Sequence, residues 1–119
     1  MPGKMTVLLI DDDPSHLKLY SWVVDKGGYR TLTALVKGNS VALPRDEQVD
    51  LTVLDYRIGT TITAVEVARQ LAATFPKKPI LVLSDLPWMP DDIAPYAAAF
   101  VRKGEPEQML QTIEKLIAA

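Results

Sequence analysis

The sequence has no cysteine and a single histidine, His16. The absence of cysteine excludes disulfides and thiolate catalysis, and it removes the usual ligands of structural zinc. One histidine cannot form a metal site built from a histidine pair. Any Ser/His/Asp triad would have to use His16 as its base. We expect His16 itself to lie on the surface of a helix, and the sequence assigns it no role.

Long apolar runs and an excess of positive charge are also missing. The first residues, MPGKMTVLLIDDD, hold one lysine and a short apolar run that ends in acid, which is too little for a signal peptide or a membrane span. With 13 Lys and Arg against 15 Asp and Glu, the net charge is -2, so binding of nucleic acid through its phosphates is not expected. These absences predict a cytoplasmic protein without direct contact to nucleic acid or membrane.

The residues that are present fit one compact domain. The chain has 119 residues, of which 48% are hydrophobic and 24% charged. This is enough for one hydrophobic core and leaves no room for a second. We therefore expect residues 1–119 to form a single domain.

Strand-like and helix-like segments alternate along the chain. Short runs of β-forming residues predict buried strands at residues 6–10, 29–35, 51–54, 79–83 and 97–101. Apolar residues at helical spacing predict helices at residues 14–26, 63–75 and 106–117. Such alternation is typical of a parallel sheet covered by helices on both faces, because parallel strands need crossover connections.

Two connections should lack a full helix. Pro44 limits any helix within residues 38–48 to one or two turns, and prolines 87, 90 and 95 disfavour a regular helix before the last strand. Between these connections, the helix at 63–75 carries Val65, Ala68, Ala72 and Phe75 at helical spacing.

Polar side chains follow the predicted strands at their carboxyl ends, where doubly wound sheets bind ligands. They are Asp11, Asp12, Asp55, Ser84 and Lys103. If the first and third strands are neighbours, the three carboxylates converge and raise one another's pKa unless a cation compensates them. Mg²⁺ suits such a site, and Ser84 and Lys103 could bind phosphoryl oxygens. The set predicts a site that handles a phosphoryl group, with an aspartate as nucleophile.

The third aspartate of the acidic run has a different assignment. Asp13 precedes Pro14, and aspartate at the N-cap with proline at the first helical position is a common way to begin a helix. We therefore assign Asp13 to the helix.

These blocks resemble a known family. LLIDDDP, VLD at Asp55, VLS at Ser84 and FVRKG at Lys103 are similar, in this order, to the conserved blocks of response-regulator receiver domains of two-component signalling, over essentially the whole chain. The resemblance implies a flavodoxin-like, doubly wound parallel sheet of five strands in the order 2-1-3-4-5, with helices on both faces. In this chain, the second and fourth helices should be shortened or irregular.

The resemblance also implies a role for each acidic residue. Asp55 would accept a phosphoryl group from the phosphohistidine of a sensor histidine kinase or a phosphotransfer protein. Mg²⁺ would be bound directly by Asp12, by Asp55 and by the backbone carbonyl of Arg57, and through water by Asp11.

The remaining matches concern the phosphoryl group and the response to it. Ser84 and Lys103 would hold the phosphoryl oxygens, and Ser84 and Phe100 would be the switch residues. The phosphorylated protein would signal to a downstream protein effector. Whether it forms a homodimer is left open by the sequence. No enzyme is implied, apart from catalysis of its own phosphorylation and dephosphorylation.

Several residues depart from the family pattern. Asp85 stands where Ala or Gly usually follows the switch hydroxyl. Arg57 occupies the position that faces the attacking water in receivers, and a bulky cation there should alter the lifetime of a phosphoaspartate. Asp85 and the interrupted fourth helix favour an alternative, a phosphorylation-independent pseudo-receiver that acts as an adaptor. That reading expects the Asp85 side chain within hydrogen-bond reach of Lys103 or Ser84.

A third hypothesis is a small phosphatase that resembles the haloacid dehalogenase superfamily. Asp11 and Asp13 satisfy its D-x-D pattern on a first strand, but this reading leaves Asp55 without a central role. Of the two tryptophans, Trp88 between prolines is the better candidate for partner contact, and Trp22 is expected to pack.

Overall fold

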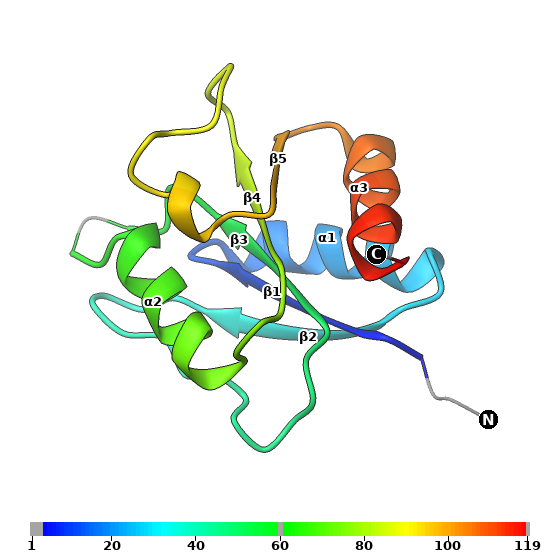
Figure 1. Ribbon diagram of the computed structural model, residues 1–119, viewed down its shortest axis with the longest axis horizontal. Coiled ribbons are helices and arrows are strands. Elements are labelled where there is room, and N and C mark those ends of the chain that lie inside the picture. The colour runs from blue at the N-terminus through cyan, green and yellow to red at the C-terminus, as the bar shows by residue number, and fades with distance from the viewer. Residues whose placement is uncertain (1–3, 60, 119) are drawn as a thin grey trace.

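One parallel sheet, with strand order β2-β1-β3-β4-β5, forms the centre of the molecule (Figure 1). The computed structural model describes residues 4–59 and 61–118. Its strands are β1 Thr6–Asp11, β2 Arg30–Leu35, β3 Leu51–Asp55, β4 Ile80–Ser84 and β5 Ala99–Arg102. Its helices are α1 Pro14–Lys26, α2 Ala64–Thr74 and α3 Pro106–Ala118, with a single 3-10 turn, η1, at Ala94–Tyr96. The predicted fold and strand order are confirmed.

Side chains of the central strands alternate between two cores. In β1, Val7 and Leu9 pack in the layer of α1 and α3, whereas Leu8 and Ile10 pack in the layer of α2. These two helix layers lie on opposite faces of the sheet (Figure 1). Burial of each such side chain stabilises the fold by about 1.5–3 kcal/mol, so the strand ends are held on a rigid base.

The helix starts follow from local sequence. The Asp13 carboxylate accepts a hydrogen bond from the Ser15 amide at 2.8 Å, and Pro14 occupies the first turn of α1, so the assignment of Asp13 to the helix start is confirmed. The hydroxyl of Thr63 caps α2 by accepting from the Glu66 amide at 3.2 Å.

The buried face of α2 differs from the one expected. Its fully buried residues are Ala64, Val67, Ala68 and Leu71. Ala72, which was expected on the apolar face, is exposed. Alanine is compatible with either side of a helix, so the spacing of alanines did not fix the rotation of α2 about its axis.

Neither interrupted connection forms a regular α-helix. Within residues 36–50 the described chain has turns and no helix, and Val36, Leu43 and Val49 cover the α2 side of the sheet instead. The helix expected between β2 and β3 is therefore absent, whereas Pro44 was expected only to shorten it. Of the helix expected between β4 and β5 only η1 is formed, in agreement with the effect expected of the prolines.

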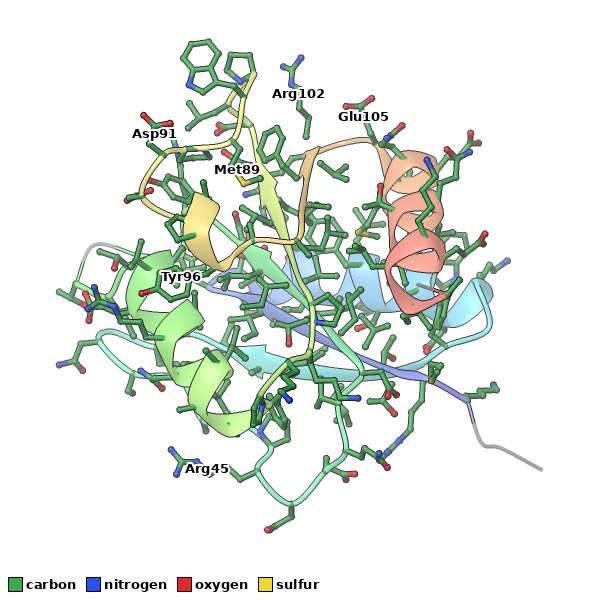
Figure 2. The ribbon with its side chains drawn as sticks, in the orientation of Figure 1. Arg45, Met89, Asp91, Tyr96, Arg102 and Glu105 are labelled. Atoms are coloured by element: carbon green, nitrogen blue, oxygen red, sulfur yellow. The ribbon has the colours of Figure 1, made fainter. Side chains whose placement is uncertain are left out.

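The irregular segment from Asp85 to Ala98 is nevertheless anchored. Ile93 is fully buried in the core beneath α2. The Tyr56 hydroxyl, just after β3, donates to Asp92 at 2.9 Å, and Tyr96, which Figure 2 shows beside α2, accepts from Arg69 Nε at 3.1 Å. The segment is thus held against the sheet by side-chain contacts, with helical hydrogen bonds only at η1.

Both tryptophans are exposed. Trp88 has 68% of its surface accessible, as expected for a residue between prolines. Trp22 is 59% accessible, with Lys26 Nζ 4.5 Å from its ring centroid, so the expectation that Trp22 packs was wrong. Among the helices of the described residues, none is long and apolar enough to cross a membrane.

Replacing Ile93 by alanine should remove the anchor of the irregular segment. Loss of a fully buried isoleucine costs about 2–5 kcal/mol of unfolding free energy, measurable by urea denaturation. The control is Trp88→Ala in the same segment, which should change stability by no more than about 0.5 kcal/mol because the side chain is exposed. Equal effects of the two substitutions would show that the segment does not contribute to the core.

Candidate functional site

The register of the sheet brings two carboxylates together. Ile10 pairs with Leu54 across β1 and β3, so the next residues, Asp11 and Asp55, end neighbouring parallel strands. Each is only 1% exposed. Two buried carboxylates at adjacent strand ends make this the most strongly charged part of the interior.

Lys103 reaches this pair from the far side of β4. Its amide donates to the Ser84 carbonyl at 2.9 Å, which fixes the loop after β5 beside the end of β4. Its Nζ lies 2.7 Å from Asp55 Oδ2. This short ion pair satisfies the buried Asp55 Oδ2, whose one close partner among the described residues is the Lys103 ammonium. Asp55 Oδ1, in contrast, accepts from the Arg57 amide at 3.2 Å.

The charges of the site shift its acid–base behaviour. Burial, together with the neighbouring Asp55 carboxylate, raises the pKa of Asp11 to about 8. Burial alone would lower the pKa of Lys103, but attraction to Asp55 and Asp11 outweighs it and raises that pKa above its ordinary value. Lys103 therefore stays charged, and one ammonium faces two carboxyl groups.

These groups could hold a divalent cation. Ligand atoms of Asp11, Asp55 and His16 all lie within 4.8 Å of one another. The two buried carboxyl groups make this donor set rich in oxygen, which fits a hard cation such as Mg²⁺. Sequence reasoning missed His16. Its place in the first turn of the helix that follows β1 was the available signal, because such a side chain lies near the strand end.

The other predicted residues lie at different distances from this centre. The Asp12 side chain is exposed and interacts with Asp11, where it contributes to the raised pKa, and direct metal binding by Asp12 stays a prediction. The metal role of the Arg57 carbonyl also stays a prediction. Ser84 is fully buried, and its Oγ accepts from the Leu86 amide at 3.1 Å, which leaves its proton free to donate. Phe100 is half-buried against the core beneath α2, and its switch role is untested.

Asp85 turns away from the acidic centre. Its Oδ1 lies 3.5 Å from Arg57 Nε, and both side chains are more than half exposed. The contact with Lys103 or Ser84 that the adaptor hypothesis expects is therefore not formed. Asp85 and Arg57, which both depart from the family pattern, thus neutralise each other's charge at the rim of the site.

A cavity of about 290 Å³ adjoins the site between α1 and the start of α3. His16 and Lys103 form part of its wall, and Tyr20, Val23 and Met109 supply apolar surface. The loop that carries Arg102 and Glu105 borders it on the side seen at the top of Figure 2. The acidic centre thus has an apolar surface next to it.

Comparison with curated proteins identifies response regulators as relatives. The chain is 28% identical over 88 residues to the transcriptional regulatory protein GlrR of Escherichia coli K12, which is 74% of this chain and 20% of that protein. It is 27% identical over 82 residues to the transcriptional regulatory protein ZraR of Salmonella typhimurium, which is 69% of this chain and 18% of that protein. The matches thus span about a fifth of the length of these relatives. No protein-family profile matches the sequence.

Solved structures with the same fold include response regulators. The chemotaxis response regulator CheY4 of Vibrio cholerae superposes with a TM-score of 0.81 at 21% identity, over 95% of this chain and 98% of that one. The response regulator TrrA of Thermotoga maritima, solved in complex with Mg²⁺ and BeF, has a TM-score of 0.75 at 20% identity, over 94% of this chain and 98% of that one. The resemblance to response-regulator receiver domains is confirmed by this fold and by the curated relatives.

The buried carboxyl of Asp11 should make stability depend on pH in a defined direction. The native group keeps its proton up to a pKa of about 8, whereas the unfolded chain releases it near 3.8. The native state binds more protons between these values, so stability falls as pH rises through that window. Without metal, Asp11→Asn should raise the free energy of unfolding by roughly 1–2 kcal/mol at about pH 7 and hardly at about pH 4.

Urea denaturation in EDTA across this pH range measures the effect. The control is Asp91→Asn, the same substitution at an exposed position in the irregular segment, away from Asp11. It should follow the pH dependence of the wild type. A stabilisation by Asp11→Asn that did not change with pH would contradict the assignment.

Proposed function

We propose that this chain is a phosphoacceptor receiver domain of a two-component pathway, phosphorylated on Asp55 in a Mg²⁺-dependent reaction. The observation that carries the proposal is the environment of Asp55. Its carboxylate is buried at the strand end, paired with Lys103 at 2.7 Å and adjacent to Asp11. A buried carboxylate held beside a fixed cation is suited to nucleophilic attack on phosphorus, because the cation can neutralise the incoming phosphoryl oxygens.

The reaction follows from these groups. A carboxylate oxygen of Asp55 attacks the phosphorus of a phosphohistidine, the P–N bond breaks, and an acyl phosphate forms on Asp55. The Lys103 ammonium, which pairs with the carboxylate at 2.7 Å, can then pair with a phosphoryl oxygen, because the acyl phosphate carries its negative charge on those oxygens. The Ser84 hydroxyl, whose proton is free, can donate to another phosphoryl oxygen.

Mg²⁺ would be held by Asp11 and Asp55, with Asp12 and the Arg57 carbonyl as further candidate ligands. When bound, it supplies the positive charge that offsets the two carboxylates and the incoming phosphoryl oxygens. Without it, Asp11 and Asp55 must share the charge of Lys103 alone, and one carboxyl is held protonated by its surroundings.

The phosphodonor protein would approach over α1. Leu19 and Trp22 on this helix are 56% and 59% exposed, although both are large and apolar. Leu19 also lines the cavity beside Lys103. A sensor histidine kinase or phosphotransfer protein that covers these side chains would bring its phosphohistidine close to Asp55. A downstream effector would recognise the phosphorylated form. In this proposal the protein acts as a phosphoacceptor and not as an enzyme on other substrates.

Phosphorylation of Asp55 can be tested directly. Incubation of the protein with acetyl phosphate and Mg²⁺ should add the mass of one phosphoryl group, detected by intact-protein mass spectrometry. Asp55→Asn should abolish the addition because an amide is not a nucleophile here, and Asp91→Asn, at an exposed position in the irregular segment, should retain it. Wild-type protein that stays unmodified at millimolar Mg²⁺ would refute the proposal.

The Arg57–Asp85 pair gives a second test, which separates the receiver from the adaptor hypothesis. Arg57→Ala should slow labelling by acetyl phosphate about three- to tenfold, because it leaves an unneutralised carboxylate near the incoming phosphoryl group. The double variant Arg57→Ala, Asp85→Ala should recover the wild-type rate. The adaptor hypothesis instead requires an unlabelled wild type and a gain of labelling in Asp85→Ala alone.

A further inference from the structure

His16 occupies an unusual position between acidic groups. Its Nδ1 lies 3.2 Å from Asp11 Oδ2, and its Nε2 lies 3.5 Å from Asp13 Oδ2. The side chain is 43% exposed, so it borders the site without being part of the core. A neutral imidazole carries one N–H and one lone pair, and therefore one of its two nitrogens must present a lone pair to a carboxyl group.

The separation of the ligand atoms matches a common metal ion. With metal–ligand bonds of about 2.0–2.2 Å, and ligand–metal–ligand angles between the octahedral and tetrahedral values, two adjacent ligand atoms lie about 3.0–3.5 Å apart. His16 Nδ1 and Asp11 Oδ2 are 3.2 Å apart, and the ligand atom of Asp55 completes a triangle with no side above 4.8 Å. An ion could therefore contact all three with small side-chain movements.

Two further observations point to a cation at this place. Asp11 and Asp55 are each only 1% exposed, and these two buried carboxyl groups face the single ammonium of Lys103, which pairs with Asp55 Oδ2 at 2.7 Å. In addition, Asp13 faces the second nitrogen of His16. A carboxylate in that position is typical of histidine ligands of metals, because it fixes the tautomer that presents the other nitrogen to the ion.

We propose that His16 completes, with Asp11 and Asp55, a site that prefers a divalent transition-metal ion such as Zn²⁺ over Mg²⁺. Imidazole nitrogen is a good ligand for Zn²⁺, whereas Mg²⁺ selects oxygen and gives up its water reluctantly. The inference deepens the proposed function, because it concerns the ion held beside the phosphoacceptor. Metal binding itself requires no phosphoryl donor, so the two can be tested separately.

The competing reading is a protonated His16 that simply forms ion pairs with Asp11 and Asp13. In that case the imidazole would be repelled by a cation in the site, and its loss would leave metal affinity unchanged or improved. The two readings therefore predict opposite consequences of removing the side chain.

The single histidine makes the first measurement unambiguous, provided that the protein carries no histidine tag. In ¹⁵N-detected NMR of the imidazole, Zn²⁺ should shift the Nδ1 resonance strongly and leave Nε2 protonated, whereas Mg²⁺ at saturating concentration should leave Nδ1 nearly unchanged. An Nδ1 resonance that does not respond to Zn²⁺ would overturn the inference.

Calorimetric titration of Zn²⁺ and Mg²⁺ into the variants gives the second measurement. His16→Gln should weaken Zn²⁺ binding by at least about tenfold and change Mg²⁺ binding by less than about threefold. The matched control is Lys18→Gln on the same helix, at an exposed position outside the site, and it should retain both affinities. Zn²⁺ affinity that is the same in His16→Gln and wild type would also overturn the inference.

Both titrations are run without phosphodonor and are compared with labelling by acetyl phosphate and Mg²⁺. Zn²⁺ binding that is independent of His16, with labelling intact, overturns the inference and leaves the proposed function standing. Zn²⁺ binding that depends on His16, with no labelling, supports the inference and refutes the phosphoacceptor.

Discussion

Two carboxyl groups, Asp11 and Asp55, are buried side by side, and this contact sets the requirements for the surrounding structure. The pairing of Ile10 with Leu54 forces the two groups together, because parallel strands in this register end at the same edge. Their mutual repulsion has to be offset by Lys103, by a retained proton or by a cation. The fold stabilises this arrangement through the two hydrophobic cores, which hold the strand ends rigidly.

The elements nearest the acidic centre are the most regular, and the irregular ones lie at its rim. β1, β3 and β4 are buried along their whole length. The irregular connections between β2 and β3 and between β4 and β5 pass over the α2 side of the sheet. Asp85 and Arg57 also belong to the rim, where a surface ion pair costs and contributes little. The irregular connections and this ion pair therefore leave the carboxylates and Lys103 in position.

The continuous apolar runs between polar strand ends were sufficient to locate the strands, and the resemblance to receiver domains supplied their order. The sequence also placed Asp11, Asp55, Ser84 and Lys103 at one edge, since residues at the carboxyl ends of parallel strands converge. It did not place side chains whose direction depends on a helix or loop. The contact of His16 with Asp11, the outward turn of Asp85 and the exposure of Trp22 depend on tertiary geometry that residue spacing does not encode.

The proline-rich segment before β5 has a thermodynamic consequence. Prolines 87, 90 and 95 fix three φ angles, so the unfolded chain has less conformational entropy to lose there than a sequence that forms a helix. Ile93, Asp92 and Tyr96 hold the inner part of this stiff segment, and its outer part, with Trp88, lies in solvent. A change of conformation in this region would therefore displace a stiff loop, rather than order or melt a helix.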